Sequence, residues 1–211
     1  MRLKFPTYGT EVLAYFGGVH HLGHLFLAEG PPAFQFGAFI ADGVRGSFLD
    51  SLPSLVKEGV RFHRWVDWQT DRHPAFQAAR RLLRPLAGRY AGLLVDFWLD
   101  VVLGENWAHF SPNQPFEAFE QHFIQKVLLP HRLWAPPSWQ DFLQRLVEQH
   151  LLRQFAQYES MLQHIEHFIR RRRLPLSPEQ VRTELRRYQA PLAEILQTFW
   201  TDALAWRRTA A

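Results

Sequence analysis

Apolar residues recur at three- and four-residue spacing along the long uninterrupted segments of this chain, a pattern typical of amphipathic helices. Over 53–71 the apolar positions are Leu55, Val56, Val60, Phe62, Trp65, Val66 and Trp68. Pro53 suits a first helical turn, and Pro74 follows the expected end of this helix. Similar patterns predict helices over 74–84, 88–104, 115–129, 138–150, 150–170 with a break near 154, and 177–206.

No repeat period, low-complexity tract or flexible linker divides these predicted helices. The 211 residues are 47% hydrophobic and include 18 Phe and 8 Trp, which is enough apolar material for a substantial core. We therefore predict an all-α fold that forms a single domain. The aromatic surplus leaves room for an oligomer, but nothing in the sequence specifies one.

The composition excludes several classes of protein. The chain has no cysteine, which excludes a disulfide scaffold, a thiol nucleophile and a Cys-liganded zinc site. No apolar run approaches the roughly 18 residues of a membrane span, and the amino terminus lacks the pattern of a signal peptide. We expect a soluble, cytoplasmic protein. Its net charge of +4 makes acidic partners plausible.

The segment His63 to Asp71 places three chemically active side chains on one face of a helix. His63, Asp67 and Asp71 have i, i+4, i+8 spacing, which suits a divalent cation. An exposed ion-pair stripe with Arg61 and Arg64 explains the spacing equally well. The pattern alone leaves both interpretations open.

Two further carboxylates, Asp96 and Asp100, lie one turn apart in a helix that is otherwise almost entirely apolar. A buried unpaired charge costs several kcal/mol, roughly, so each needs a cation, an arginine or a proton. A functional cation site is favoured here. Arg45 or Arg64 as a neutralising partner is the alternative.

Near the amino terminus, His20, His21 and His24 precede an apolar segment, and Asp42 is a lone carboxylate in the apolar run that follows. With His63, Asp67 and Asp100 they give an ordered set of imidazoles and carboxylates on several helices. An all-α metal-dependent phosphohydrolase needs such a set. Nucleotide-binding loops, a nucleophile elbow and the zinc-protease helix motif are all missing from the sequence.

Several ordered segments resemble the bacterial acyl carrier protein phosphodiesterases, a divergent branch of the HD-domain phosphohydrolases. The resemblance rests on His24-Leu25-Phe26-Leu27-Ala28, on the run from Gly37 to Gly46, and on Gly59 to Asp67 with Thr70, Asp71 and Pro74. It continues through Asp96, Asp100, Leu103 and Trp107. The match covers residues 20–206 as one HD-like helical bundle and leaves 1–19 as an amino-terminal extension.

The resemblance implies a hydrolase of lipid metabolism and fatty acid biosynthesis. Such an enzyme uses a divalent metal, typically Mn²⁺, to remove 4′-phosphopantetheine from holo-acyl carrier protein. Carried over by position, the metal residues are His24, Asp42, His63, Asp67 and Asp100. The catalytic residues are His63, Asp67, Asp71 and Asp96, and the expected phosphate-binding residues are Arg45 and Arg64. The basic surface suits acyl carrier protein, which is small and acidic.

The sequence departs from the family pattern at two positions. Val101 stands where the family has His after Asp, and Ala38 stands where the family has Asn. Two hypotheses follow: either the enzyme is active and His20 or His21 supplies the missing nitrogen, or the chain is a degenerate homologue. A degenerate homologue would act on another phosphoester or serve as a binding module.

Nucleic-acid binding is a third hypothesis, based on the arginine run 170–173 and on Arg182, Arg186 and Arg187. Basic residues at the end of a helix commonly offset the helix dipole. We therefore favour a docking surface for an acidic protein and expect no nucleic-acid partner.

Overall fold

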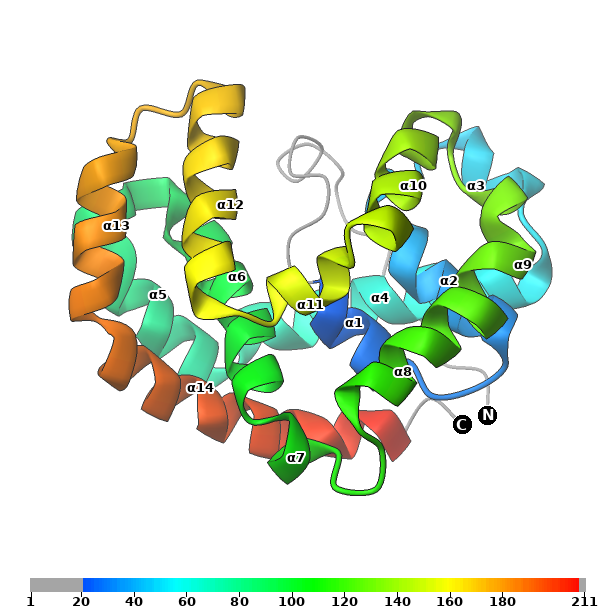
Figure 1. Ribbon diagram of the computed structural model, residues 1–211, viewed down its shortest axis with the longest axis horizontal. Helices are drawn as coiled ribbons and strands as arrows, with labels where there is room; N and C mark the ends of the chain where they lie inside the picture. The colour runs from blue at the N-terminus through cyan, green and yellow to red at the C-terminus, as the bar shows by residue number, and fades with distance from the viewer. Residues whose placement is uncertain (1–20, 209–211) are drawn as a thin grey trace.

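The computed structural model describes residues 21–208, and this part of the chain is helical throughout and contains no strand (Figure 1). The all-α prediction is confirmed. The extension predicted for 1–19, and His20, lie outside the described residues. None of the helices described has the length and apolar character needed to cross a membrane. The HD-like arrangement stays a prediction.

The helices follow one another with short connections. They are α1 (His21–Leu27), α2 (Pro32–Ile40), α3 (Ser47–Ser51), α4 (Ser54–Arg72), α5 (Pro74–Ala87), α6 (Ala91–Glu105), α7 (Trp107–Phe110), α8 (Phe116–His122), α9 (Leu129–His131), α10 (Gln140–Glu148), α11 (Leu151–Phe155), α12 (Tyr158–Arg172), α13 (Pro178–Arg187) and α14 (Gln189–Ala203). Short turns connect them: η1 (Ala41–Gly43), η2 (Gly88–Tyr90), η4 (Arg132–Trp134), η5 (Pro137–Trp139) and η6 (Leu204–Arg208), with a π-helical segment η3 (Phe123–Leu128) after α8.

Prolines explain two differences from the predicted boundaries. Pro85 does not end α5 at residue 84, because it lies in the last turn and removes only one hydrogen bond before the helix ends at Ala87. The helix predicted over 177–206 is two helices, separated at Tyr188. Pro191 in the first turn of α14 cannot donate to the carbonyl four residues earlier, so α13 cannot continue through it.

Buried side chains form two hydrophobic clusters, and α1 and α4 contribute to both. One cluster joins α5, α6, α12, α13 and α14, and includes Leu22 of α1 and Val66 of α4. The other joins α2, η3, α10 and α11, and includes Leu25 of α1 and Val60 of α4. In Figure 1 α1 and α4 accordingly lie between the α5–α6–α12–α13 group and the α2–α3–α9–α10 group. Side chains on α1 and α4 are therefore held from two sides.

The helices α2 and α4 cross with their backbones in contact, which two glycines permit. A Cβ atom on Gly59 of α4 would lie 2.0 Å from the carbonyl oxygen of Phe34, and one on Gly37 of α2 would lie 2.1 Å from that of Val56. Because neither position has room for any side chain, this close crossing depends on glycine at both. It fixes the distance between α2 and the His63 turn of α4.

Candidate metal centre

Three ligand-type side chains from α1 and α4 converge where these helices meet. The Nε2 atom of His24 lies 3.1 Å from Oδ1 of Asp67, and Nε2 of His63 lies 3.4 Å from Oδ2 of the same carboxylate. The two imidazole rings stack with their centroids 3.6 Å apart. Both histidines are buried and Asp67 is partly exposed, so the group meets solvent at Asp67.

The ring of His63 is held in one orientation by the neighbouring helix. Its Nδ1 donates to the backbone carbonyl of Ala38, 2.8 Å away, so Nε2 is the nitrogen that faces His24 and Asp67. Fixing one imidazole nitrogen in this way is the usual arrangement around metal-binding histidines. Any residue at position 38 supplies that carbonyl, so this bond does not depend on a side chain at Ala38.

The donor set fits a divalent cation. One ligand atom from each of His24, His63 and Asp67 lies within 4.8 Å of the other two. Two imidazole nitrogens and a carboxylate oxygen suit borderline and hard divalent ions such as Zn²⁺, Fe²⁺ and Mn²⁺. Of the face predicted on α4, His63 and Asp67 belong to this group and Asp71 does not; His24 of α1, also among the predicted metal residues, is its third member.

Asp42 in η1 approaches the same imidazole from the α2 side. Its Oδ1 lies 3.4 Å from Nε2 of His63. Burial would raise the pKa of Asp42, but the charge and hydrogen bond of His63 hold it below its ordinary value. Burial alone would lower the pKa of His63, whereas the carboxylates of Asp67 and Asp42 raise it to about 9. Without a cation, a proton on His63 balances these carboxylates.

Asp96 and Asp71 add further negative charge around this group. Desolvation raises the pKa of Asp96 well above its ordinary value, and the carboxylates of Asp67, Asp71, Asp42 and Asp100 raise it further. Desolvation and Asp67 also raise the pKa of Asp71, although nearby arginines oppose the change. A cluster of carboxylates that repel one another is stabilised by a proton or by a bound cation.

Asp100 is buried and anchors the start of α1. Its Oδ2 accepts a hydrogen bond of 3.0 Å from the backbone N–H of Leu22, and its Oδ1 accepts one of 2.9 Å from Gly23. The compact group of ligand atoms comprises His24, His63 and Asp67 and does not include Asp100. The adjacent Val101 is fully buried in the first hydrophobic cluster.

The two arginines expected to bind phosphate have different surroundings. Arg64 donates a 3.1 Å hydrogen bond to the carbonyl of Val44 and interacts electrostatically with Asp67 and Asp42, which places it beside the centre. The exposed Arg45 has no side-chain hydrogen bond or ion pair within the described part of the chain. Of the two, Arg64 is the one whose contacts within the described residues place it at the centre.

His21 lies in an aromatic cluster, and it interacts electrostatically with Asp42. Its ring centroid is 5.2–5.8 Å from those of four aromatic residues: Phe39, Trp139, Phe142 and Phe155. The other imidazole proposed as a substitute ligand, His20, lies outside the described residues. The compact ligand group found among residues 21–208 does not include His21.

Sequence reasoning missed Trp139, whose indole lies against the turn that carries Asp42. A Cβ atom on Gly43 would lie 2.3 Å from Trp139 Nε1, so the indole packs directly on the glycine backbone. The sequence signal for this contact was Gly43, immediately after Asp42, because a glycine often marks a place where the backbone closely approaches another group. No feature of the sequence indicated that Trp139, about a hundred residues later in the chain, is the group that packs on Gly43.

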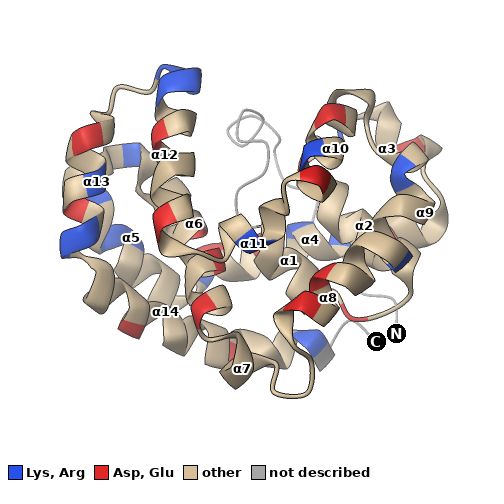
Figure 2. Cartoon of the chain, viewed as in Figure 1, with Lys and Arg blue, Asp and Glu red and all other residues tan. Residues whose placement is uncertain are grey.

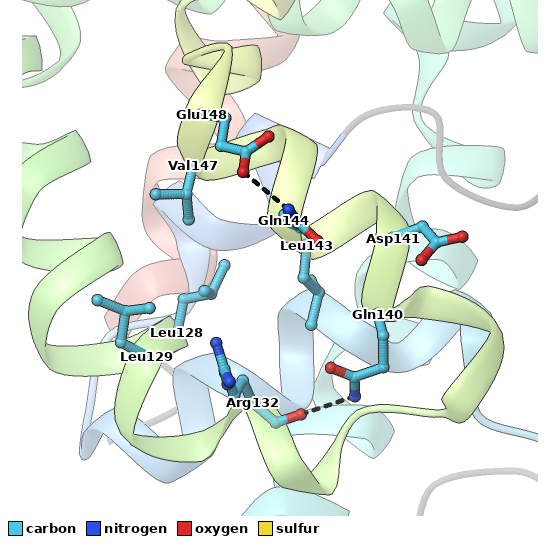
Figure 3. Close-up of a pocket in the computed structure, with 9 residues that line it drawn as sticks. All are labelled: Leu128, Leu129, Arg132, Gln140, Asp141, Leu143, Gln144, Val147 and Glu148. Carbon is cyan, nitrogen blue, oxygen red and sulfur yellow. Dashed lines mark hydrogen bonds between the residues drawn. The ribbon is translucent and has the colours of Figure 1, made fainter.

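A pocket of about 460 Å³ opens elsewhere, between η3 and α10 (Figure 3). Leu128 and Leu143 form part of its wall, and Arg132 accepts a hydrogen bond from Gln140 at its backbone carbonyl. None of its lining residues belongs to the predicted site. The pocket is therefore separate from the candidate metal centre.

Comparison with known proteins places the sequence in a family. A family model described as "Acyl carrier protein phosphodiesterase" matches residues 19–203. A protein of that name from Klebsiella pneumoniae (strain 342) is 29% identical over 143 residues, which are 67% of this chain and 72% of the relative. One from Photorhabdus laumondii subsp. laumondii is 32% identical over 138 residues, 65% of this chain and 69% of the relative. No solved structure is significantly similar to this chain.

The matched range contains both helices that build the centre and the carboxylates around it. The family match therefore covers His24, His63 and Asp67 as well as most of both hydrophobic clusters. From its sequence, the chain belongs to the acyl carrier protein phosphodiesterase family.

Proposed function

We propose that this protein is a phosphoric diester hydrolase that removes 4′-phosphopantetheine from holo-acyl carrier protein and leaves the apo form. The observation that carries the proposal is the convergence of His24, His63 and Asp67 inside a cluster of repelling carboxylates. Family membership gives the reaction class and the substrate. The cytoplasm is the proposed place of action.

We assign the metal position to Nε2 of His24, Nε2 of His63 and the carboxylate of Asp67, with Asp42 beside them. A bound divalent cation would lower the pKa of a coordinated water and neutralise charge on the phosphodiester. Mn²⁺ is our proposal for the ion, because a mixed set of imidazole and carboxylate ligands suits it. His63 must lose its proton before its Nε2 can bind any cation.

The remaining polar residues orient the substrate and move a proton. Arg64, fixed by Val44, is positioned to hold the phosphodiester with the donors of its guanidinium. Water attacks phosphorus and loses a proton to the solvent, the bond from phosphorus to the serine oxygen of the carrier protein breaks, and that oxygen takes up a proton. We assign the donation of this proton to Asp96, whose raised pKa favours its protonated form. We assign Asp71 a supporting role, because its carboxylate helps to raise the pKa of Asp96.

His24, His63 and Asp67 come together without an imidazole at position 101. Val101 packs in the core, and the carbonyl of Ala38 still fixes His63, so neither departure from the family pattern removes a member of the compact ligand group. This supports an active enzyme over a degenerate homologue. It also makes a substitute nitrogen from His21 unnecessary for that group.

Mass spectrometry of holo-acyl carrier protein, incubated with the purified enzyme and Mn²⁺, tests the proposal. We expect loss of the phosphopantetheine mass, and we expect a chelator to prevent it. An unchanged carrier mass with Mn²⁺ bound to the enzyme would instead indicate another phosphoester substrate. An unchanged mass with no metal bound would identify a degenerate homologue.

A further inference from the structure

Four arginines of α12 and α13 are paired with acidic residues of the same two helices, whereas Arg171, Arg172 and Arg173 form no ion pair within the described part of the chain. Arg170 lies 2.8 Å from Glu179, and Arg186 lies 3.2 Å from Glu159. Arg182 pairs with Glu166 in the same way, and Arg187 pairs with Glu184. Three of these pairs join α12 to α13, so they fasten the two helices together rather than present free positive charge.

The arginines of α4 and α5 have no such partners. Within the described part of the chain, Arg61, Arg64, Arg80 and Arg84 form no ion pair, and all four are exposed. Arg61 and Arg64 are neighbours at i, i+3, and Arg80 and Arg84 are neighbours at i, i+4. Like charges at these spacings destabilise a helix by about 0.2–0.5 kcal/mol per pair, so they do not contribute to folding. Figure 2 shows basic residues on both helices.

One member of each arginine pair, Arg64 and Arg80, interacts with a carboxylate around the metal centre. On α4, Arg64 is bonded to Val44, two residues after Asp42. On α5, the Cδ atom of Arg80 lies 3.7 Å from the position that a Cβ atom would occupy if one were added to Gly92 of α6. Gly92 and Asp96 are four residues apart and share a face of α6, so Arg80 lies over the face that carries Asp96. Arg80 also interacts electrostatically with Asp71.

We propose that Arg61 and Arg64 of α4, with Arg80 and Arg84 of α5, form the docking surface for the acidic protein that carries the phosphodiester. This inference rests on the proposed function. A negatively charged partner that contacts both arginine pairs lies across the metal centre. In that position the partner presents its prosthetic arm to His24 and His63. We place the docking surface on α4 and α5 rather than on α12 and α13, because four arginines of α12 and α13 are paired with glutamates of the same helices, whereas Arg64 and Arg80 interact with carboxylates of the centre.

Binding of apo-acyl carrier protein tests the assignment without turnover. The double variant Arg61→Gln/Arg84→Gln removes one charge from each pair and leaves Arg64 in place. We expect its affinity, measured by fluorescence anisotropy at low ionic strength, to fall about tenfold, with a weaker dependence on salt. The matched control is Arg171→Gln/Arg173→Gln at the end of α12, for which we expect a change within about twofold.

Circular dichroism and metal content establish that both variants are folded. A larger loss of affinity in the α12 control, or equal affinity in both variants and the wild type, would overturn the proposal. Tighter binding of a DNA duplex than of apo-acyl carrier protein at the same salt concentration would overturn the choice of partner.

If the wild type leaves holo-acyl carrier protein intact, the proposed function fails. If it releases the arm while the α4–α5 variant binds normally, only the docking surface is wrong.

Discussion

The imidazole rings of His24 and His63 stack face to face, with their centroids 3.6 Å apart, although the two residues lie 39 positions apart in the sequence and on different helices. Both rings direct Nε2 toward Asp67, so the carboxylate lies close to two nitrogens at once. Two stacked imidazoles that share a carboxylate form one side of the proposed metal site. Most of the chemistry expected of this protein depends on that arrangement.

His24→Ala should abolish stoichiometric Mn²⁺ binding, because it removes one of the converging ligand atoms. We expect the metal affinity to fall at least about a hundredfold, measured by calorimetric titration and by metal analysis after gel filtration. His109→Ala is the control, since His109 is exposed and lies on α7. Unchanged metal content in His24→Ala would exclude the proposed ligand set.

The metal-free protein should lose stability as the pH rises from about 6.5 to 9. The pKa of His63 is about 9 in the folded chain and about 6.5 when unfolded, so the folded state binds an extra proton between these values. The resulting stabilisation, at most about 3 kcal/mol, is fully present below pH 6.5 and is lost as the pH passes 9. Urea unfolding in the presence of a chelator measures it.

His63→Gln serves as the control for this pH dependence, because glutamine does not titrate. Its free energy of unfolding should stay nearly constant over the same pH range. A wild-type profile as flat as that of the variant would show that His63 is not protonated in the metal-free protein.

Asp96→Asn should stabilise the metal-free protein at pH 7 and weaken metal binding. The raised pKa of Asp96 means that its charged form is disfavoured in the folded state, so a neutral amide relieves repulsion by on the order of 1 kcal/mol. The gain should disappear near pH 3, where the carboxyl group is protonated in both states. Asp50→Asn on the exposed end of α3 should change stability by less than about 0.5 kcal/mol. Equal effects of the two substitutions would contradict the carboxylate cluster.

Asp100→Asn should destabilise the fold by about 1–3 kcal/mol, because one of the two backbone N–H groups at the start of α1 loses its acceptor. If Asp100 acts by anchoring α1, the folded variant should still bind one metal ion, with an affinity reduced roughly 10- to 100-fold. Asp202→Asn, an exposed carboxylate beside His73, is the control. Normal stability with complete loss of metal would identify Asp100 as a ligand instead.

Gly59→Ala should disrupt the crossing of α2 and α4, because the added Cβ would lie 2.0 Å from the Phe34 carbonyl oxygen. We expect at least about 3 kcal/mol of destabilisation and loss of metal binding, since His63 follows one turn later. Gly92→Ala is the matched control: the atoms nearest to its Cβ lie at 3.7 and 3.9 Å, which is ordinary contact. Thermal unfolding of the two variants should therefore differ widely, and similar midpoints would contradict the close crossing.

The apolar spacing of the sequence predicted most helices, since a helix buries one face and that face repeats every three to four residues. The helix over 53–71 agrees with α4 to within a residue at each end. The effect of the prolines was harder to predict, because it depends on which turn of a helix a proline occupies. Pro85 lies inside α5, in its last turn, whereas Pro191 lies in the first turn of α14. Spacing alone does not specify the turn.

Within α4, the sequence by itself determined that His63 and Asp67 share a face, because i, i+4 neighbours on a helix must lie together. Only the tertiary structure decided that His24 completes the group and that Asp100 holds the start of α1. It also decided that the Ala38 carbonyl orients His63 and that Arg80 packs against Gly92 of α6. Those relations arise where separate helices meet. Helix crossings depend on packing over the whole core, and no local pattern in the chain encodes them.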